Sequence, residues 1–258
     1  MSENGKVVLI TGAVKNSGYA MALKFAREGY SVCITSRNAR NAAQTAAEIS
    51  REYGVPARGF GLDLESPKDI RRVFGELYEE FHRLDVFVGN SANLGVGILA
   101  ADITEEEYDG VMNVNAKGNF FCCQEAYRIM RQQHSGSIVL IGSVHARGAI
   151  FGRTTYAMSK GAISSLTRNL AFEFAGDGVR VNSVVPGAVR TDRWDSFTPE
   201  QEAARRKNWP LGMEASGDDI ANAVYFLASD QSKSTTGSEL VVDSGALTCL
   251  LTYNGGKH

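Results

Sequence analysis

Short apolar runs alternate with segments of helical periodicity along the whole chain. The strand-like runs cover residues 6–11, 31–36, 57–62, 84–88, 137–141, 179–185 and 239–242. The helical patterns cover residues 18–28, 39–53, 67–81, 105–133, 155–174 and 218–228. Nearly continuous apolar strands separated by helices are typical of a parallel sheet that is buried on both faces. The pattern predicts an α/β fold, a doubly wound parallel sheet of about seven strands with helices on both faces.

No linker, repeat or low-complexity segment interrupts this alternation, so residues 1–258 are predicted to form a single domain. The one long irregular stretch spans residues 186–217 and contains two tryptophans and a helical patch at about 200–207. A connection of that length in a compact domain is more often a lid over a site than filler. We therefore expect residues 186–217 to cover the substrate.

Composition narrows the classes of partner. The chain has 43% hydrophobic and 22% charged residues and a net charge of −2, without a basic run. This predicts neither a nucleic-acid partner nor a membrane partner. The four cysteines lack zinc-ligand spacing and favour free intracellular thiols. The first residues enter a strand with no apolar signal region, so a cytoplasmic location is expected.

Candidate chemistry gathers between residues 142 and 160. Ser143 follows an apolar strand, and Tyr156 and Lys160 lie four residues apart in a predicted helix, hence on one face. The Lys160 charge is expected to lower the Tyr156 pKa, and Ser143 is placed to bind the same substrate oxygen. This is an acid/base site for a carbonyl or an alcohol. Tyr253 and Lys257 have the same spacing, but their glycine-rich surroundings argue against a helix.

The first strand runs into a glycine-containing turn and then a helix, which is typical of a site for a dinucleotide pyrophosphate. A plain strand-to-helix turn is the alternative. The turn residues expected to bind the cofactor are Gly12, Lys15, Asn16, Ser17 and Gly18.

The end of the second strand indicates which dinucleotide binds. NAD sites usually place an acid there, whereas this chain has Ser36 and Arg37, with Lys15 nearby in the glycine turn. Cations without an acid suit a 2′-phosphate, so NADP(H) is favoured over NAD(H). The alternative is that both cations are solvated surface residues.

Taken together, these motifs resemble the short-chain dehydrogenase/reductase family along nearly the whole chain, in order as well as content. The resemblance implies a Rossmann-type sheet. It also adds cofactor contacts at the remaining family motifs, namely Asp63, Leu64, Asn90, Ser91, Ala92, Pro186, Gly187 and Thr191. The chain departs from the family at Asn16, which replaces the middle glycine, and at Gly89, Ser91 and Ala92 in the family's N-N-A-G stretch. These departures affect the fit of the cofactor and leave the reacting groups in place.

The resemblance implies a hydride mechanism carried by Asn115, Ser143, Tyr156 and Lys160. Tyr156 would protonate the carbonyl oxygen and Ser143 would orient it. Lys160 would also bind the nicotinamide ribose, and Asn115 would hold a water that links Lys160 to solvent. With this tetrad complete, the chain is expected to be an NADP(H)-dependent oxidoreductase that reduces a ketone or oxidises a secondary alcohol. A non-catalytic dinucleotide sensor on the same fold is the alternative. Enoyl reductases of the family space tyrosine and lysine farther apart.

Residues 144–155 and 188–217 are expected to select the substrate. They carry several cations beside aromatic rings, which would suit a polar or anionic compound such as an oxoacyl, sugar or polyol-type substrate. The alternative is that most of these arginines face water or another subunit. The resemblance further implies a homotetramer or dimer, with residues 105–133, 155–174 and the last strand at the interfaces.

Overall fold

The computed structural model of the chain describes residues 5–95 and 97–249. Tyr253 and Lys257 lie outside these residues. Seven strands form one sheet in the order β3-β2-β1-β4-β5-β6-β7, and every neighbouring pair is parallel. The strands are β1 (Val7–Ile10), β2 (Ser31–Ser36), β3 (Ala57–Gly61), β4 (Val86–Gly89), β5 (Gly136–Ile141), β6 (Val179–Pro186) and β7 (Glu239–Val242). This confirms the predicted doubly wound, Rossmann-type sheet.

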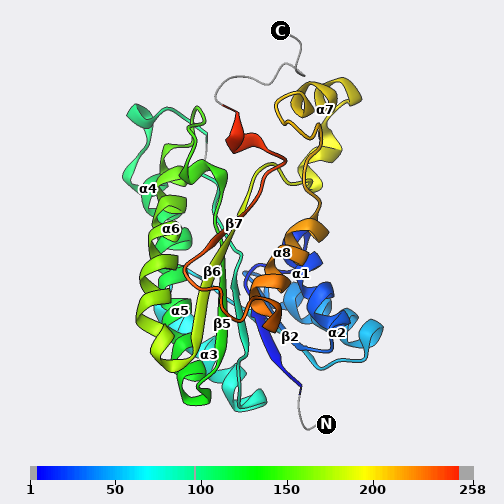
Figure 1. Ribbon diagram of the computed structural model, residues 1–258, viewed down its shortest axis with the longest axis vertical. Helices are drawn as coiled ribbons and strands as arrows, with labels where there is room; N and C mark the ends of the chain where they lie inside the picture. Colours follow the sequence, from blue (N-terminus) through cyan, green and yellow to red (C-terminus); the bar gives the residue numbers. More distant parts are fainter. Residues whose placement is uncertain (1–4, 96, 250–258) are drawn as a thin grey trace.

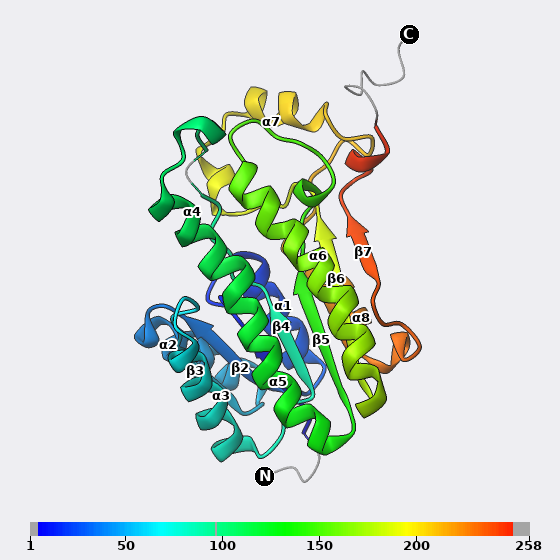
Figure 2. The same cartoon turned by 90° about the vertical axis from the view of Figure 1, so that its left-hand side faces the viewer.

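Helices cover both faces of the sheet, as Figures 1 and 2 show. One layer contains α1 (Asn16–Arg27), α2 (Ala39–Tyr53) and α8 (Gly217–Ala228). The opposite layer contains α3 (Pro67–Phe81), α4 (Glu105–Met112), α5 (Asn119–Gln133) and α6 (Thr154–Phe174). Both faces of the strands are therefore dry, which explains why the strands are apolar runs rather than alternating ones.

Local capping sets the ends of several helices. The Asn38 side chain accepts a hydrogen bond from Asn41 N at 3.2 Å at the start of α2. Gly54 ends that helix with a φ of 69°, in the left-handed region that glycine reaches without strain. Ser66 caps α3 ahead of Pro67, whose missing N–H costs nothing in a first turn. These signals lie in the sequence, and the predicted bounds of α2 and α3 are confirmed.

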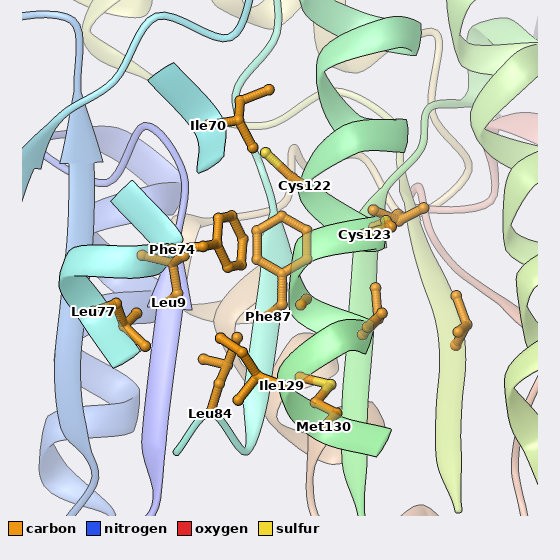
Figure 3. Packing of buried hydrophobic residues seen from close by; sticks show 14 of the residues in the cluster. Leu9, Ile70, Phe74, Leu77, Leu84, Phe87, Cys122, Cys123, Ile129 and Met130 are labelled. Atoms are coloured by element: carbon orange, nitrogen blue, oxygen red, sulfur yellow. The ribbon is translucent and has the colours of Figure 1, made fainter. Parts of the chain in front are cut away.

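The core between the sheet and the α3/α5/α6 layer centres on a pair of aromatic rings. Phe74 and Phe87 meet edge to face with centroids 5.7 Å apart, as Figure 3 shows. Cys122 and Cys123 of α5 are buried in the same cluster. Each fully buried large side chain contributes about 1.5–3 kcal/mol, so this layer holds β4 and β5 rigidly in register. The ends of these two strands carry the site described below.

The predicted helix over residues 105–133 is not uniform. It contains α4, then a π-helical segment (Asn113–Gly118), then α5. The predicted irregular stretch 186–217 is likewise partly ordered, by a 3-10 helix (Asp192–Ser196) and α7 (Pro199–Arg206). In Figures 1 and 2, α7 lies beyond the carboxyl ends of β6 and β7. No helix among the described residues is long and apolar enough to cross a membrane.

Candidate active site

The carboxyl ends of β1 and β4 are joined through Thr11 and Asn90. The Thr11 hydroxyl accepts hydrogen bonds from the backbone N–H groups of Asn90 and Ser91, at 2.9 and 3.1 Å. The Asn90 amide donates to the carbonyls of Thr11 and Gly12, at 2.9 and 3.1 Å. Asn90 therefore shapes the glycine turn from within the protein. Thr11 was not among the predicted site residues, although it opens the motif.

The glycine turn leaves no room for side chains where a dinucleotide would approach. Gly12 has a φ of 63°, and a Cβ there would overlap the Ser91 hydroxyl. A Cβ on Gly18 would overlap the Gly12 carbonyl. Asn16, which replaces the family's middle glycine, has a φ of 52°, a conformation that asparagine tolerates better than most residues. The turn and the start of α1, where Ser17 is half-buried, thus fit a bound pyrophosphate.

Lys15 and Asn16 contact the opposite wall of the site. Lys15 Nζ lies 2.6 Å from Asp192 Oδ2, and Asn16 Nδ2 lies 3.2 Å from Asp192 Oδ1. Asn16 Oδ1 in turn accepts a hydrogen bond from Asp192 N at 3.1 Å. The Lys15 charge, expected at a 2′-phosphate, is therefore engaged by a carboxylate 177 positions away. The turn and the segment after β6 are tied together across the cofactor site.

The end of β2 borders an open hollow of about 710 Å³ lined by Arg37, Asn38, Ala39 and Arg40. The Ser36 hydroxyl accepts a hydrogen bond from Asn38 N at 3.2 Å, which turns the chain into α2. Arg37 is exposed on the rim, which fits both the predicted phosphate contact and the alternative of a solvated surface cation. Arg40, in the first turn of α2, was not predicted. The sequence did contain a signal for Arg40 as a second cation at this site, because it lies three residues after Arg37 and near the start of the predicted helix.

Asp63 and Leu64, which follow β3, differ in their exposure to solvent. Asp63 is exposed, and its carboxylate accepts a hydrogen bond from Glu65 N at 3.0 Å. Leu64 is 7% exposed and belongs to the core between the sheet and α5. Ala92 is exposed near the end of β4. Of these three side chains, only Asp63 and Ala92 face solvent, where a ligand could reach them.

Ser143 and Tyr156 come together where β5 ends. The Ser143 hydroxyl lies 2.8 Å from His145 Nδ1, and the rings of His145 and Tyr156 meet edge to face at 5.4 Å. Lys160 Nζ lies 5.5 Å from the centroid of the Tyr156 ring and donates to Ile141 O at 2.7 Å. The structure therefore brings together the serine, tyrosine and lysine that the spacing predicted. It also adds His145 as a partner of the serine.

Electrostatics at the phenol differ from the expectation. Burial raises the pKa of Tyr156, and the Ser143 hydroxyl and the charges of Arg153 and Arg193 oppose that rise. Burial also lowers the pKa of Lys160 to about 8, so most of its positive charge remains at neutral pH. The predicted net lowering of the Tyr156 pKa is wrong for this structure, because burial outweighs the Ser143 hydroxyl and the charges of Arg153 and Arg193, and Lys160 is not among the groups that lower this pKa. Tyr156 stays protonated at neutral pH and is suited to act as an acid.

Asn115 lies in the π-helical segment and is completely buried. Its Oδ1 accepts from Asn93 N at 2.7 Å, and its Nδ2 donates to Asn93 O at 2.8 Å and to Ser159 Oγ at 2.9 Å. Ser159 Oγ donates in turn to Tyr156 O at 2.7 Å. Asn115 therefore links the chain after β4 to the helix that carries Tyr156. A π-turn often marks a functional site, because it shifts the side chains that follow it.

The segment after β6 carries the remaining predicted residues. Pro186 ends the strand, and a Cβ on Gly187 would lie 2.8 Å from Asp243 Cα, so glycine is needed there. Thr191 precedes the 3-10 helix (Asp192–Ser196). Trp194 of that helix is 4% exposed. It packs inside this segment and is not available to a substrate.

Most arginines near the site are paired. Arg190 and Arg206 each contact both Glu202 and Glu214, at 2.7–3.2 Å. These contacts lower the pKa of Glu214 to about 2, mainly through the Arg206 hydrogen bond. Arg190 is one of the cations in residues 188–217 that were expected to select the substrate, and it is instead engaged in this network.

The fold, the glycine turn and the Ser–Tyr–Lys cluster define a dinucleotide-dependent oxidoreductase. A family profile described as "Enoyl-(Acyl carrier protein) reductase" matches residues 12–247. The chain is 32% identical over 240 residues to 3-oxoacyl-[acyl-carrier-protein] reductase of Staphylococcus aureus, covering 93% of this chain and 97% of the relative. It is 35% identical over 246 residues to 2-(S)-hydroxypropyl-CoM dehydrogenase 3 of Xanthobacter autotrophicus, covering 93% and 96%.

Among solved structures, ElxO with NADP bound superposes with a TM-score of 0.88 at 29% identity, covering 95% of this chain and all of ElxO. The chain belongs to the short-chain dehydrogenase/reductase family. It is an enzyme that acts on CH–OH or C=O groups with a nicotinamide dinucleotide. The predicted family and enzyme class are confirmed.

Proposed function

We propose that this protein reduces a ketone with NADPH, or oxidises the corresponding secondary alcohol with NADP⁺. The observation that carries the proposal is the protonated Tyr156 phenol beside Ser143 at the end of β5, with buried Lys160 one turn away. A non-catalytic family member would not need to bury the Lys160 ammonium next to a half-buried phenol, because that burial costs free energy. This is what disfavours a non-catalytic sensor.

Ser143, His145, Tyr156 and Lys160 each have a separate part in one proton transfer. The nicotinamide, when bound, supplies the hydride that reduces the carbonyl carbon. Tyr156 Oη gives its proton to the carbonyl oxygen, and the Ser143 hydroxyl holds that oxygen in place. His145 at 2.8 Å positions the Ser143 hydroxyl. Lys160, whose pKa lies at about 8, can return a proton to the tyrosine near neutral pH. The water held by Asn115 remains a prediction.

The preference for NADP(H) is supported by the end of β2. Arg37 and Arg40 line the open hollow there, and Ser36 stands where NAD-specific relatives place an acid. ElxO, a structural relative, has been solved with NADP. Lys15 adds to a phosphate site only if it leaves Asp192, so Arg37 and Arg40 are the main candidates.

The names of the relatives and the polar walls of the site support a proposal for the class of substrate. We propose a polar oxoacyl, sugar or polyol-type compound. By their names, the relatives above are a 3-oxoacyl-[acyl-carrier-protein] reductase and a 2-(S)-hydroxypropyl-CoM dehydrogenase. A family profile is named for enoyl reductases, but the four-residue spacing of Tyr156 and Lys160 favours carbonyl chemistry.

The test is a substrate panel followed by one substitution. The purified protein is mixed with NADPH and a set of ketones, ketoses and oxoacyl thioesters, and the fall in absorbance at ~340 nm is followed. Tyr156→Phe should lower kcat by roughly 10³-fold or more, because the variant keeps the aromatic ring but lacks the hydroxyl proton. Its affinity for NADPH should stay within about twofold of that of the wild type. Tyr78→Phe, at an exposed tyrosine on α3, is the matched control. Tight NADPH binding with no turnover of any compound would favour the sensor.

We also propose a homotetramer or dimer in the cytoplasm. Large apolar side chains are exposed on the helices expected at the interfaces, namely Tyr108, Phe120, Met158 and Phe172. The four cysteines, all within the described residues, are unpaired thiols, which suits a reducing compartment.

A further inference from the structure

The cations that surround the site fall into two groups. Lys15 pairs with Asp192, Arg147 with Glu239, and Arg190 with Glu202 and Glu214. These charges are compensated inside the protein. Arg153 and Arg193 are different, since neither forms an ion pair with a carboxylate in the part of the chain that the structure describes.

Arg153 is held in the wall that Tyr156 also lines. Its Nη1 donates to Leu94 O at 2.8 Å and to Gly95 O at 3.4 Å. A Cβ on Gly97 would lie 3.8 Å from Cζ and from Nη2, an ordinary van der Waals distance, so the guanidinium lies close to the chain at residue 97. Within residues 5–95 and 97–249, Nε and Nη2 have no hydrogen-bond acceptor. A fixed guanidinium with two uncommitted donor groups is therefore built into the site.

The loop before α6 supports this position. Gly152 has a φ of 70°, and a Cβ there would lie 2.8 Å from Gly97 O. The two loops thus touch at paired glycines directly beside Arg153. Arg153 is the N-cap residue of α6, and Tyr156 lies in the first turn of that helix. The small cavity between the loops is lined by both of them.

Arg193 lies in the segment after β6. It belongs to the 3-10 helix (Asp192–Ser196), between Asp192, which is tied to Lys15, and the buried Trp194. The charges of Arg153 and Arg193 both act to lower the pKa of Tyr156, against the effect of burial. The one carboxylate on the cavity wall is Glu107, and its Oε2 accepts hydrogen bonds from Thr104 at the start of α4.

We propose that Arg153 binds an anionic group of the substrate (a carboxylate, sulfonate or phosphate) on the ketone that Tyr156 protonates. This deepens the proposed function and rests on it. Guanidinium groups bind such oxyanions through paired, charge-assisted hydrogen bonds. A bound anion would supply the acceptors that Arg153 lacks, and it would hold the carbonyl at a set distance from the phenol.

The test uses matched ketones that differ in charge. The probes are 3-oxobutanoate, 2-oxopropane-1-sulfonate and dihydroxyacetone phosphate, with methyl 3-oxobutanoate as the neutral partner. The kcat/KM for each is measured with NADPH for wild type, Arg153→Met and Arg153→Lys. Arg51→Met, at an exposed arginine on α2, controls for the lost charge.

For the anionic probe that the wild type prefers, Arg153→Met should lower kcat/KM by roughly 10- to 100-fold. The neutral ester should lose less than about threefold, and Arg153→Lys should recover part of the loss. A purely structural arginine would lower both values equally. An unchanged ratio of anionic to neutral kcat/KM in Arg153→Met would overturn the proposal and leave the proposed function standing.

A binding measurement separates the two hypotheses if turnover is absent. Tyr156→Phe is loaded with NADPH, and its fluorescence is titrated with each probe. Adding Arg153→Met to this background should weaken the Kd of the anionic probe by the same roughly 10- to 100-fold. Equal Kd values with and without Arg153 would refute the anion site. A wild type that binds the anion but reduces no ketone would refute the proposed function instead.

Discussion

The ammonium of Lys160 is buried beneath the phenol that it was expected to activate. Its hydrogen bond to Ile141 O satisfies one of three donors, and burial lowers its pKa to about 8. The sequence showed which residue types meet, because spacing of four on a helix is a local property. It could not show which effect dominates the pKa, because burial depends on β4, β5 and the π-helical segment packing around the same point.

Lys160 should make the stability of the protein depend on pH. Its pKa is lower in the folded protein than the ordinary value of 10.5, so between pH 8 and 10.5 the unfolded state binds more protons. The free energy of unfolding of wild type, relative to Lys160→Met, should therefore rise by up to about 3 kcal/mol over that interval. Urea unfolding at pH 7.5, 9 and 10.5 measures this difference.

Lys68→Met, at an exposed lysine in the first turn of α3, is the control and should give a curve parallel to wild type. If Lys160→Met also runs parallel to wild type across the interval, the ammonium is not desolvated as the structure has it.

At the scale of elements, the junction of β2 and α2 shows how far local sequence signals predict a helix. Capping by Asn38 and the left-handed Gly54 are local signals, and the helix was predicted with the bounds it has. The π-helical segment inside residues 105–133 was not predicted. It is stabilised by contacts of Asn115 with Asn93 and Ser159, which lie in other segments. Periodicity within one segment cannot report such contacts.

The β2–α2 junction also carries the prediction about cofactor choice. Arg37→Ala should raise the KM for NADPH by roughly 10- to 100-fold and leave the KM for NADH within about twofold. Only NADPH carries the 2′-phosphate, so only NADPH loses charge-assisted hydrogen bonds when Arg37 is removed. Arg40→Ala should act in the same direction. Initial rates with both cofactors measure the ratio.

Arg51→Ala, farther along α2, serves as the control for net charge. Equal increases in KM for the two cofactors would remove Arg37 from the 2′-phosphate site, and with it the main argument for NADP(H).

At the scale of the whole molecule, α5 and α6 carry the exposed apolar side chains Phe120, Met158 and Phe172. These two helices belong to the layer that covers one face of the sheet (Figure 2). Phe172 of α6 is 89% exposed, which is unusual for a large aromatic ring unless a partner covers it. The family resemblance predicts α6 at a subunit interface, and Phe172 is a residue through which that prediction can be tested.

Phe172→Glu should therefore weaken assembly, because a buried charge without a partner costs several kcal/mol. Light scattering after size-exclusion chromatography should give a tetramer or dimer for wild type and a smaller species for the variant. Tyr78→Glu, on α3 outside the expected interface, is the control. A wild type that elutes as a monomer contradicts the proposed assembly.

The amino-acid sequence alone determined the order and type of the elements, the family, and the identity of the Ser143, Tyr156 and Lys160 cluster. These follow from apolar periodicity, caps and motif spacing, all of which act over short stretches of chain. Only the tertiary structure decided which charged side chains form ion pairs within the protein. Lys15 and Asp192 are 177 positions apart, and whether a cation is paired or open to a ligand depends on what the fold brings beside it.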